Sequence, residues 1–273
     1  MTNLSDQELV FSDGYRSHMR RWESESGADE TVLALHGLIG HSGVMDGLGR
    51  QLAGRPGIAC VGYDRRGTGE CTAARGDSPG IERTVDDVIE AAERAAGGRP
   101  VHVLAWCGSG GFAGMAIERA PHLFKTLTLL SPLFPEGETA FAMGKTQAFL
   151  ARAEGRPLDE LLPAPDFVHA FVDEPDVAQF VADERILKLI TKRLIGMFVG
   201  AIGKTVEILP RLSLPQTAIV ATRDRIVDCT KSRANLQKWI KPERLFEVPG
   251  AHAPWFTCGQ EVGDIFERVT LGR

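Results

Sequence analysis

The chain has 273 residues, is 43% hydrophobic and 25% charged, and carries a formal net charge of -5. This length fits one large α/β domain or two small ones and allows a sizeable core. The composition excludes a disordered, collagen-like or coiled-coil chain, and the mild acidity gives no electrostatic footprint for nucleic acid or an anionic membrane. No apolar run approaches the roughly 20 residues of a membrane span.

The amino terminus, MTNLSDQELV, lacks the basic start and apolar centre of a signal peptide, so we expect a cytoplasmic protein. Five cysteines lie at positions 60, 71, 107, 229 and 258, with no CxxC pair. In a chain of this size without a secretion signal, we expect neither a disulfide framework nor a zinc site. We predict no metal and no cofactor.

Short apolar runs predict strands. Residues 8–11 and 15–22 flank a Ser-Asp-Gly turn and predict an antiparallel hairpin at a sheet edge. Later runs are typical of strands buried on both faces, at residues 32–35, 58–63, 101–105, 126–130, 218–221 and 245–248. Helical patterns alternate with them, at residues 84–96 (with Thr84 as a possible cap), 110–119 and 232–239. The alternation predicts an α/β fold with a mainly parallel sheet flanked by helices.

The pattern changes between residues 134 and 210. We predict no strand there, and amphipathic helical stretches such as 177–198 dominate. A helical insertion at the carboxyl edge of a sheet usually forms a lid over a binding site, since ligands of open α/β sheets bind at that edge. We therefore divide the chain into a first core part (1–133), a helical cap (134–210) and a second core part (211–273). A helical layer without a gating role is the alternative.

The stretch VHVLAWCGSGG at 101–111 runs from an apolar strand through small residues into a helix, as in a nucleophile elbow. With Cys107 at the centre, the small neighbours that the sharp turn needs are Ala105 and Ser109. The thiol would lie at the amino end of the helix, which favours a thiolate. A second register centres on Ser109 and needs a strand two residues longer. A buried inert cysteine is a third interpretation. We favour Cys107 because the strand pattern ends at Ala105.

Polar groups follow other predicted strands. After residues 32–35 comes His-Gly-Leu-Ile-Gly, so we expect the N–H groups of Leu38 and Gly108 to form an oxyanion hole. Asp224 and Asp228 follow a later strand, and His252 follows the last one. A thiol, an acid and a histidine at successive strand ends match the order of one known fold.

With these motifs the chain resembles the α/β-hydrolase superfamily over nearly its whole length. The matching pieces are HGLIG at 36–40, DRRGTG at 64–69, LAWCGSGG at 104–111, RDRIVD at 223–228 and PGAHAPW at 249–255. The resemblance implies a triad of Cys107 as nucleophile, His252 as base and Asp224 as acid, with Asp228 as the reserve acid. It departs from the usual pattern in carrying Cys107 where a serine is usual, and Ala and Ser at the elbow glycines.

A cysteine changes the expected chemistry. Proton transfer from Cys107 to His252 gives a thiolate that attacks an acyl carbonyl and forms an enzyme thioester. Exchange of that thioester with a pantetheine thiol is nearly balanced in energy. Among cysteine-elbow relatives, dienelactone hydrolases lack a large cap and polyhydroxyalkanoate synthases are longer. The chain is most similar to the acyl or aminoacyl shuttle enzymes and thioesterases of nonribosomal peptide and polyketide pathways.

We therefore expect an acyltransferase that moves an acyl or aminoacyl group between carrier-protein thiols. The alternatives are a hydrolase (a thioesterase, or an enzyme for small esters or lactones) and a non-catalytic ligand-binding relative.

For the acyl pocket we expect Trp106, beside the nucleophile, and Trp255, beside the base. Cap aromatics are further candidates, although aromatics at helical spacing are more often core: Phe141, Phe149, Phe171 and Phe198. Candidates for a substrate amine are Asp173 and Glu174, and candidates for an acidic carrier protein are Lys188, Lys192 and Arg193. For both sets a solvated surface is the alternative. We expect no nucleic-acid or membrane partner.

Overall fold

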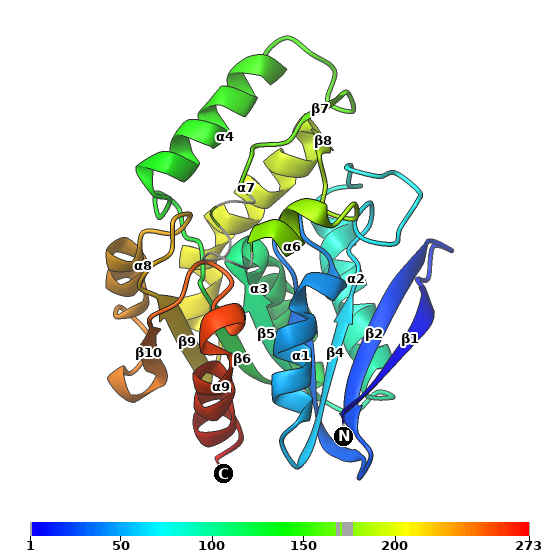
Figure 1. The fold of residues 1–273 in the computed structure, drawn as a ribbon, viewed down its shortest axis with the longest axis vertical. Helices are drawn as coiled ribbons and strands as arrows, with labels where there is room; N and C mark the ends of the chain where they lie inside the picture. The colour runs from blue at the N-terminus through cyan, green and yellow to red at the C-terminus, as the bar shows by residue number, and fades with distance from the viewer. Residues whose placement is uncertain (1, 168–169, 171–176, 273) are drawn as a thin grey trace.

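The structure of the chain, a computed structural model, describes residues 2–167, 170 and 177–272. Its centre is an eight-stranded sheet of order β1-β2-β4-β3-β5-β6-β9-β10 (Figure 1). The strands are β1 (Thr2–Val10), β2 (Arg16–Ser24), β3 (Ala28–Leu35), β4 (Gly57–Tyr63), β5 (Val101–Trp106), β6 (Phe124–Leu130), β9 (Gln216–Ala221) and β10 (Leu245–Val248). The pairs β1–β2 and β2–β4 are antiparallel and the others parallel. The predicted edge hairpin and mainly parallel sheet are confirmed.

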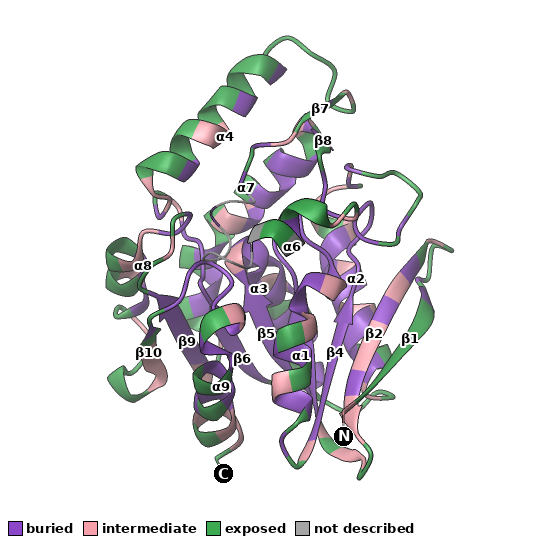
Figure 2. Cartoon of the chain, in the orientation of Figure 1, coloured by how far each residue is buried: buried purple, intermediate pink, exposed green. Residues whose placement is uncertain are grey.

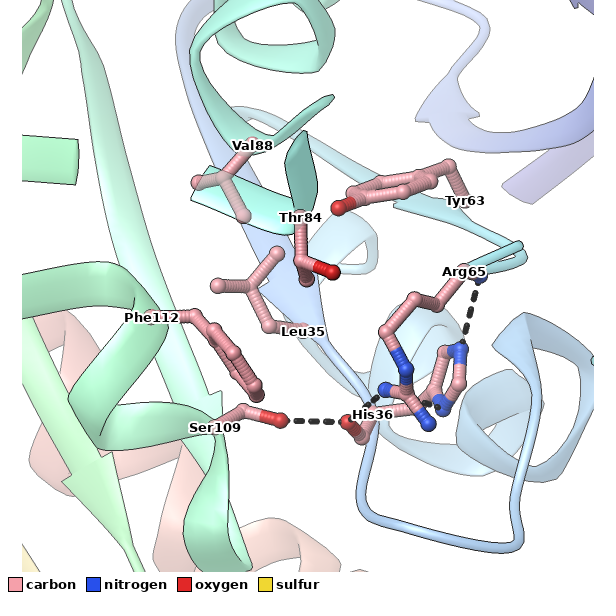
Figure 3. Close-up of a pocket in the computed structure, with 8 residues that line it drawn as sticks. All are labelled: Leu35, His36, Tyr63, Arg65, Thr84, Val88, Ser109 and Phe112. Carbon is pink, nitrogen blue, oxygen red and sulfur yellow. Dashed lines mark hydrogen bonds between the residues drawn. The ribbon is translucent and has the colours of Figure 1, made fainter. Parts of the chain in front are cut away.

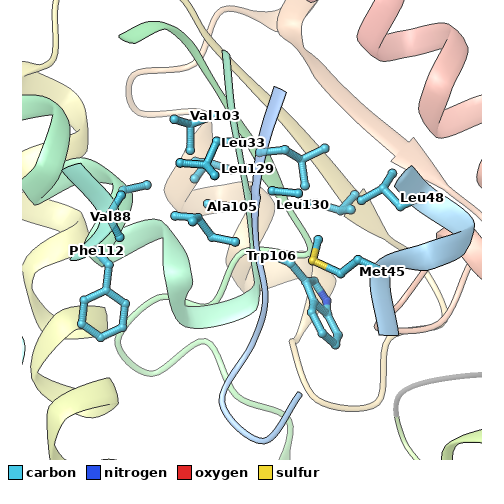
Figure 4. Close-up of a cluster of buried hydrophobic side chains, with 14 of the residues drawn as sticks. Leu33, Met45, Leu48, Val88, Val103, Ala105, Trp106, Phe112, Leu129 and Leu130 are labelled. Carbon is cyan, nitrogen blue, oxygen red and sulfur yellow. The ribbon is translucent and has the colours of Figure 1, made fainter. Parts of the chain in front are cut away.

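The central strands are mostly apolar because helices cover both faces of the sheet. All six residues of β5 are buried. Helices α1 (Asp46–Ala53) and α9 (Trp255–Ile265) lie against one face, and α2 (Ile81–Ala95) and α3 (Gly110–Arg119) against the other. In Figure 4 the side chains of Val88 and Phe112 lie on one side of the sheet, and those of Met45 and Leu48 on the other.

Two helix starts differ from the sequence prediction. Helix α2 begins at Ile81, one turn early, so Thr84 does not cap it; its hydroxyl donates to the carbonyl of Gly80 (2.8 Å). Helix α8 (Cys229–Leu236) begins three residues before the predicted position, because the side chain of Asp228 caps it by accepting from the N–H of Lys231 (3.1 Å). Helix α3 has the predicted bounds.

The segment between β6 and β9 contains α4 (Ala140–Ala153), α6 (Val177–Ala182) and α7 (Lys192–Ile208), together with two short strands. The strands β7 (Leu161–Pro163) and β8 (Leu189–Thr191) pair antiparallel, so the prediction of no strand here is wrong.

The prediction of a single helical stretch over 177–198 is also wrong. The Asp183 carboxylate accepts from the N–H of Arg185 (2.9 Å), which turns the chain after α6. The next main-chain groups form hydrogen bonds with the core instead of continuing a helix. The N–H of Leu187 donates to the carbonyl of Ile39 (3.1 Å), and the N–H of Thr191 donates to the carbonyl of Gly76 (2.9 Å). The lid role and the three-part division of the chain stay predictions.

Helix α4 projects from the rest of the molecule and is exposed along most of its length (Figures 1 and 2). Helix α7, by contrast, packs closely on α3. At Gly111 a Cβ atom would overlap the carbonyl oxygen of Ala201 in α7. The glycine therefore sets the distance between the two helices.

We predict that Gly111→Ala lowers the free energy of unfolding by about 1–3 kcal/mol, because the added methyl group meets rigid backbone. The control is Gly144→Ala in α4, where a Cβ meets nothing within 4 Å. That change should be neutral or stabilise by up to about 1 kcal/mol. Urea unfolding of both variants measures the difference, and equal stabilities would contradict the close packing of α3 on α7.

Candidate active site

The sharp turn after β5 lies at Cys107. The strand ends at Trp106, one residue later than predicted, and Cys107 has a φ of 63° before the chain enters α3. For a residue other than glycine this conformation costs roughly 1–2 kcal/mol. Ser109 lies beyond the turn, and its buried hydroxyl donates to the carbonyl of His36. Of the two registers considered, the structure therefore has Cys107 at the turn.

His252 and Asp224 form a buried pair. The Nδ1 of His252 donates to Oδ2 of Asp224 (2.8 Å), and their side chains are 0% and 1% exposed. The other oxygen, Oδ1, accepts from the N–H groups of Ile226 (2.8 Å) and Val227 (2.9 Å), which fixes the carboxylate. Asp228, the reserve candidate, instead caps α8. The structure thus pairs Asp224, not Asp228, with the histidine.

The surroundings of His252 favour its protonated form. Burial alone lowers the pKa of a histidine, but the Asp224 carboxylate and the Cys107 sulfur, by charge and hydrogen bonding, raise the pKa of His252 above its usual range. The imidazole is thus bonded to an acid through Nδ1 and lines the same cavity as the Cys107 side chain. This arrangement fits proton exchange between Cys107 and His252.

One cavity contains Cys107 and His252. Its empty volume is about 560 Å³, and Leu38 and Trp106 also line it. The rest of its wall is mostly apolar and includes Phe167, Ile195, Phe198, Ile202 and Ile226. We call this space the inner cavity.

Arg65 fixes the loop of residues 36–38 through hydrogen bonds to its carbonyl groups. Its guanidinium, buried and without a carboxylate partner in the described residues, donates to the carbonyls of Gly37 (3.2 Å) and Leu38 (2.7 Å). In a trans peptide the N–H points opposite to the C=O. Because the Gly37 carbonyl faces Arg65, the Leu38 N–H points away from Arg65. Figure 3 shows Arg65 beside His36, with Ser109 bonded to the same loop.

The His36 ring strengthens this arrangement. Burial, aided by the charge of Arg65, holds the pKa of His36 well below its usual range, so the ring is neutral. Its Nε2 accepts from the main-chain N–H of Arg65 (3.0 Å), and its Nδ1 donates to the carbonyl of Gly37 (2.8 Å). Arg66, the next residue of the DRRGTG loop, pairs with buried Asp87 (2.6 Å).

Only some of the residues predicted to form the acyl pocket line the inner cavity. Trp255 does not line the inner cavity; it packs edge-to-face on Trp106 (4.8 Å between centroids) and donates to the carbonyl of Val44 (3.1 Å). We therefore do not retain it as a substrate contact. Among the cap aromatics Phe198 lines the cavity, whereas Phe149 is buried outside the lining and Phe141 is partly exposed.

Three of the remaining candidates, namely Phe171, Asp173 and Glu174, lie outside the described residues. Lys188 is exposed, while Arg193 pairs with Asp77.

Sequence reasoning missed Glu138 and Thr146, two polar side chains in the lining. No motif surrounds Glu138, and only tertiary contacts bring it to the cavity.

In the part of the chain that the structure describes, no three His, Cys, Asp or Glu side chains gather in a way that suits a metal ion. No described helix is both long and apolar enough to cross a membrane.

Solved structures of hydrolases and of a thioesterase share this fold. The thioesterase domain from the curacin biosynthetic pathway is 14% identical, with a TM-score of 0.65, over 96% of this chain and 99% of that one. A soluble variant of monoglyceride lipase from Saccharomyces cerevisiae is 15% identical, with a TM-score of 0.78, over 96% and 94%. A hydrolase from Pseudomonas aeruginosa is 22% identical, with a TM-score of 0.71, over 99% of each chain. The likeness establishes the predicted α/β-hydrolase fold.

The family follows from the sequence itself. The model of the family described as serine aminopeptidase, S33, matches residues 26–251. The chain therefore belongs to this family and is an enzyme of the α/β-hydrolase type. No curated protein matches the chain. The family description names a serine, whereas position 107 in this chain is a cysteine.

We predict that Asp224→Asn lowers the pKa of His252, because the carboxylate that favours the imidazolium is lost. Since the folded pKa lies above the unfolded value of about 6.5, protonated His252 stabilises the wild type fully below that pH. This stabilisation is lost as the pH rises through the folded value.

The pH titration of the His252 ring signals by NMR measures the shift. Asp228→Asn is the matched control, because asparagine caps a helix as well as aspartate does. An unchanged His252 titration in Asp224→Asn would contradict the pairing.

Proposed function

We propose that the protein is a thioesterase that works through a covalent acyl-Cys107 intermediate. One observation carries the proposal: the Cys107 side chain, at a strained turn, shares an apolar cavity with His252, whose ring is bonded to Asp224. The family and the structural neighbours, among them a thioesterase domain, support a hydrolase. They favour this alternative over the carrier-to-carrier transfer expected from the sequence.

The first half-reaction forms the acyl-enzyme. His252 accepts the Cys107 proton, and the thiolate attacks the carbonyl carbon of an acyl thioester. Asp224 orients the ring and offsets its positive charge. The N–H groups of Leu38 and Gly108 bind the oxyanion of the tetrahedral intermediate. As the bond to the leaving sulfur breaks, the imidazolium returns its proton to that sulfur.

The second half-reaction releases the acid. His252 takes a proton from water as the water oxygen attacks the acyl carbon of the enzyme thioester. The new tetrahedral intermediate expels the sulfur of Cys107, which regains its proton from His252. The products are a carboxylic acid and the free thiol.

The second candidate function is transfer of the acyl group from Cys107 to another thiol instead of to water. The use of a cysteine as nucleophile favours it. An acyl group on Cys107 is a thioester, so its transfer to another thiol is nearly balanced in energy. An ester on serine would make that transfer uphill. The apolar wall of the inner cavity also disfavours water near the acyl-enzyme. In that reaction a carrier-protein pantetheine thiol takes the place of water.

The test is to incubate the protein with a panel of acyl thioesters and to measure the mass of the peptide that contains Cys107. We expect one acyl group on Cys107 and none in Cys107→Ala. Release of the acyl group from Cys107 into buffer supports the thioesterase. A stable acyl-enzyme from which only an added thiol removes the acyl group supports transfer between thiols. An acyl group on another residue, or no adduct with any thioester, would overturn the proposal.

A serine at this position separates a cysteine site from a serine site. We predict that Cys107→Ser lowers the turnover of acyl thioesters by about 100-fold, since the hydroxyl is a much weaker acid than the thiol. Steady-state kinetics measure this, with melting temperature as the control for folding. A serine variant more active than the natural chain would mean that the site is built for serine.

A further inference from the structure

The inner cavity contains one carboxyl group, that of Glu138, among its described lining residues. Apart from Cys107, His252 and the indole of Trp106, whose N–H donates to the carbonyl of His252, the only other polar side chain among the described lining residues is Thr146. Glu138 also lines a neighbouring groove with an empty volume of about 630 Å³, which shares Leu133 and Ile202 with the inner cavity. Glu138 therefore lies where the two spaces meet.

The backbone around Glu138 is tied to the loop that carries Asp224. Glu138 forms an antiparallel bridge with Val227, and the N–H of Thr139 donates to the carbonyl of Ile226 (2.9 Å). The N–H groups of Ile226 and Val227 in turn bind the Asp224 carboxylate. The position of Glu138 relative to the His252–Asp224 pair is thus fixed by hydrogen bonds.

The carboxyl of Glu138 has no countercharge in the part of the chain that the structure describes. Its Oε1 accepts from the hydroxyl of Thr146 (3.3 Å), and in residues 2–167, 170 and 177–272 no basic nitrogen forms an ion pair with it. Burial raises the pKa of Glu138, and the Thr146 bond only partly offsets this. Two other buried or partly buried carboxylates differ, since Asp87 pairs with Arg66 and Asp183 with Arg185.

A carboxylate held at an apolar wall without an ion-pair partner raises the free energy of the folded protein. A ligand that brings a positive charge to this carboxylate offsets that free energy. We propose that Glu138 binds a cationic group of the acyl chain, so that the preferred substrates are thioesters whose acyl group carries an ammonium. This inference rests on the proposed function, because it assigns the substrate class of the same site. Glu138 acts here in binding; the acid–base work stays with His252.

The test compares pairs of acyl thioesters that differ only in a terminal ammonium or methyl group, over several chain lengths. In the wild type we expect kcat/KM to favour the ammonium member of at least one pair by about tenfold or more, because a hydrogen bond to a charged partner contributes more than a neutral one. In Glu138→Gln this ratio should fall towards one. Glu138→Asp, which keeps the charge on a shorter side chain, should retain part of it.

The matched control is Glu136→Gln, an exposed carboxyl two residues away that does not line the inner cavity. This variant should keep the wild-type ratio. Melting temperatures show whether each variant folds. A ratio unchanged in Glu138→Gln, or a wild-type preference for the methyl member, would overturn the inference.

A second measurement separates this inference from the proposed function. Calorimetry on Cys107→Ala, with amide analogues of the same pairs, measures binding without acylation. A preference for the ammonium analogue that depends on Glu138 supports the inference even if no thioester acylates the wild type. Binding of neither analogue, or equal binding of both, overturns it.

Discussion

The positive φ angle of Cys107 is the constraint on which the arrangement of the site depends. A cysteine adopts this conformation at a cost, so the surrounding structure has to impose it. Strand β5 is fixed on both sides by β3 and β6, and α3 starts just past the turn. Small residues leave room for it: a Cβ on Gly37 would lie 3.4 Å from the Cβ of Cys107, and one on Gly108 would lie 3.0 Å from Ile202.

The elbow, the loop of residues 36–38 and helix α7 share their contacts. Arg65 orients the loop through its carbonyl groups, and its guanidinium lies 4.5 Å from the ring centre of Phe198 in α7. Phe198 lines the inner cavity with Cys107. Burial lowers the pKa of Arg65 to about 10, and the side chain remains a cation at neutral pH. Arg65 therefore connects the loop of residues 36–38 to helix α7.

The sequence predicted the parts of this site that depend on local pattern. The strands and the turn at Cys107 follow from apolar runs that end in small or polar residues. The pairing of His252 with Asp224, rather than Asp228, was what the resemblance to the α/β-hydrolase superfamily implied. Contacts between distant segments could not be predicted from the sequence. Trp255 packs on Trp106, and backbone bonds to residues 226 and 227 bring Glu138 to the cavity. The cap was the least predictable part, because hydrogen bonds to the core replace a helix at residues 183–191.

The rate of alkylation of Cys107 as a function of pH tests the central claim, that Cys107 is a nucleophile activated by His252, most directly. Iodoacetamide labelling followed by peptide mass spectrometry gives this rate, with half-buried Cys229 as the internal reference. We predict that Cys107 reacts much faster than Cys229 at pH 7 and loses this advantage in His252→Ala, because the imidazolium that favours the thiolate is gone. A Cys107 that reacts no faster than Cys229, or equally fast without His252, would contradict the claim.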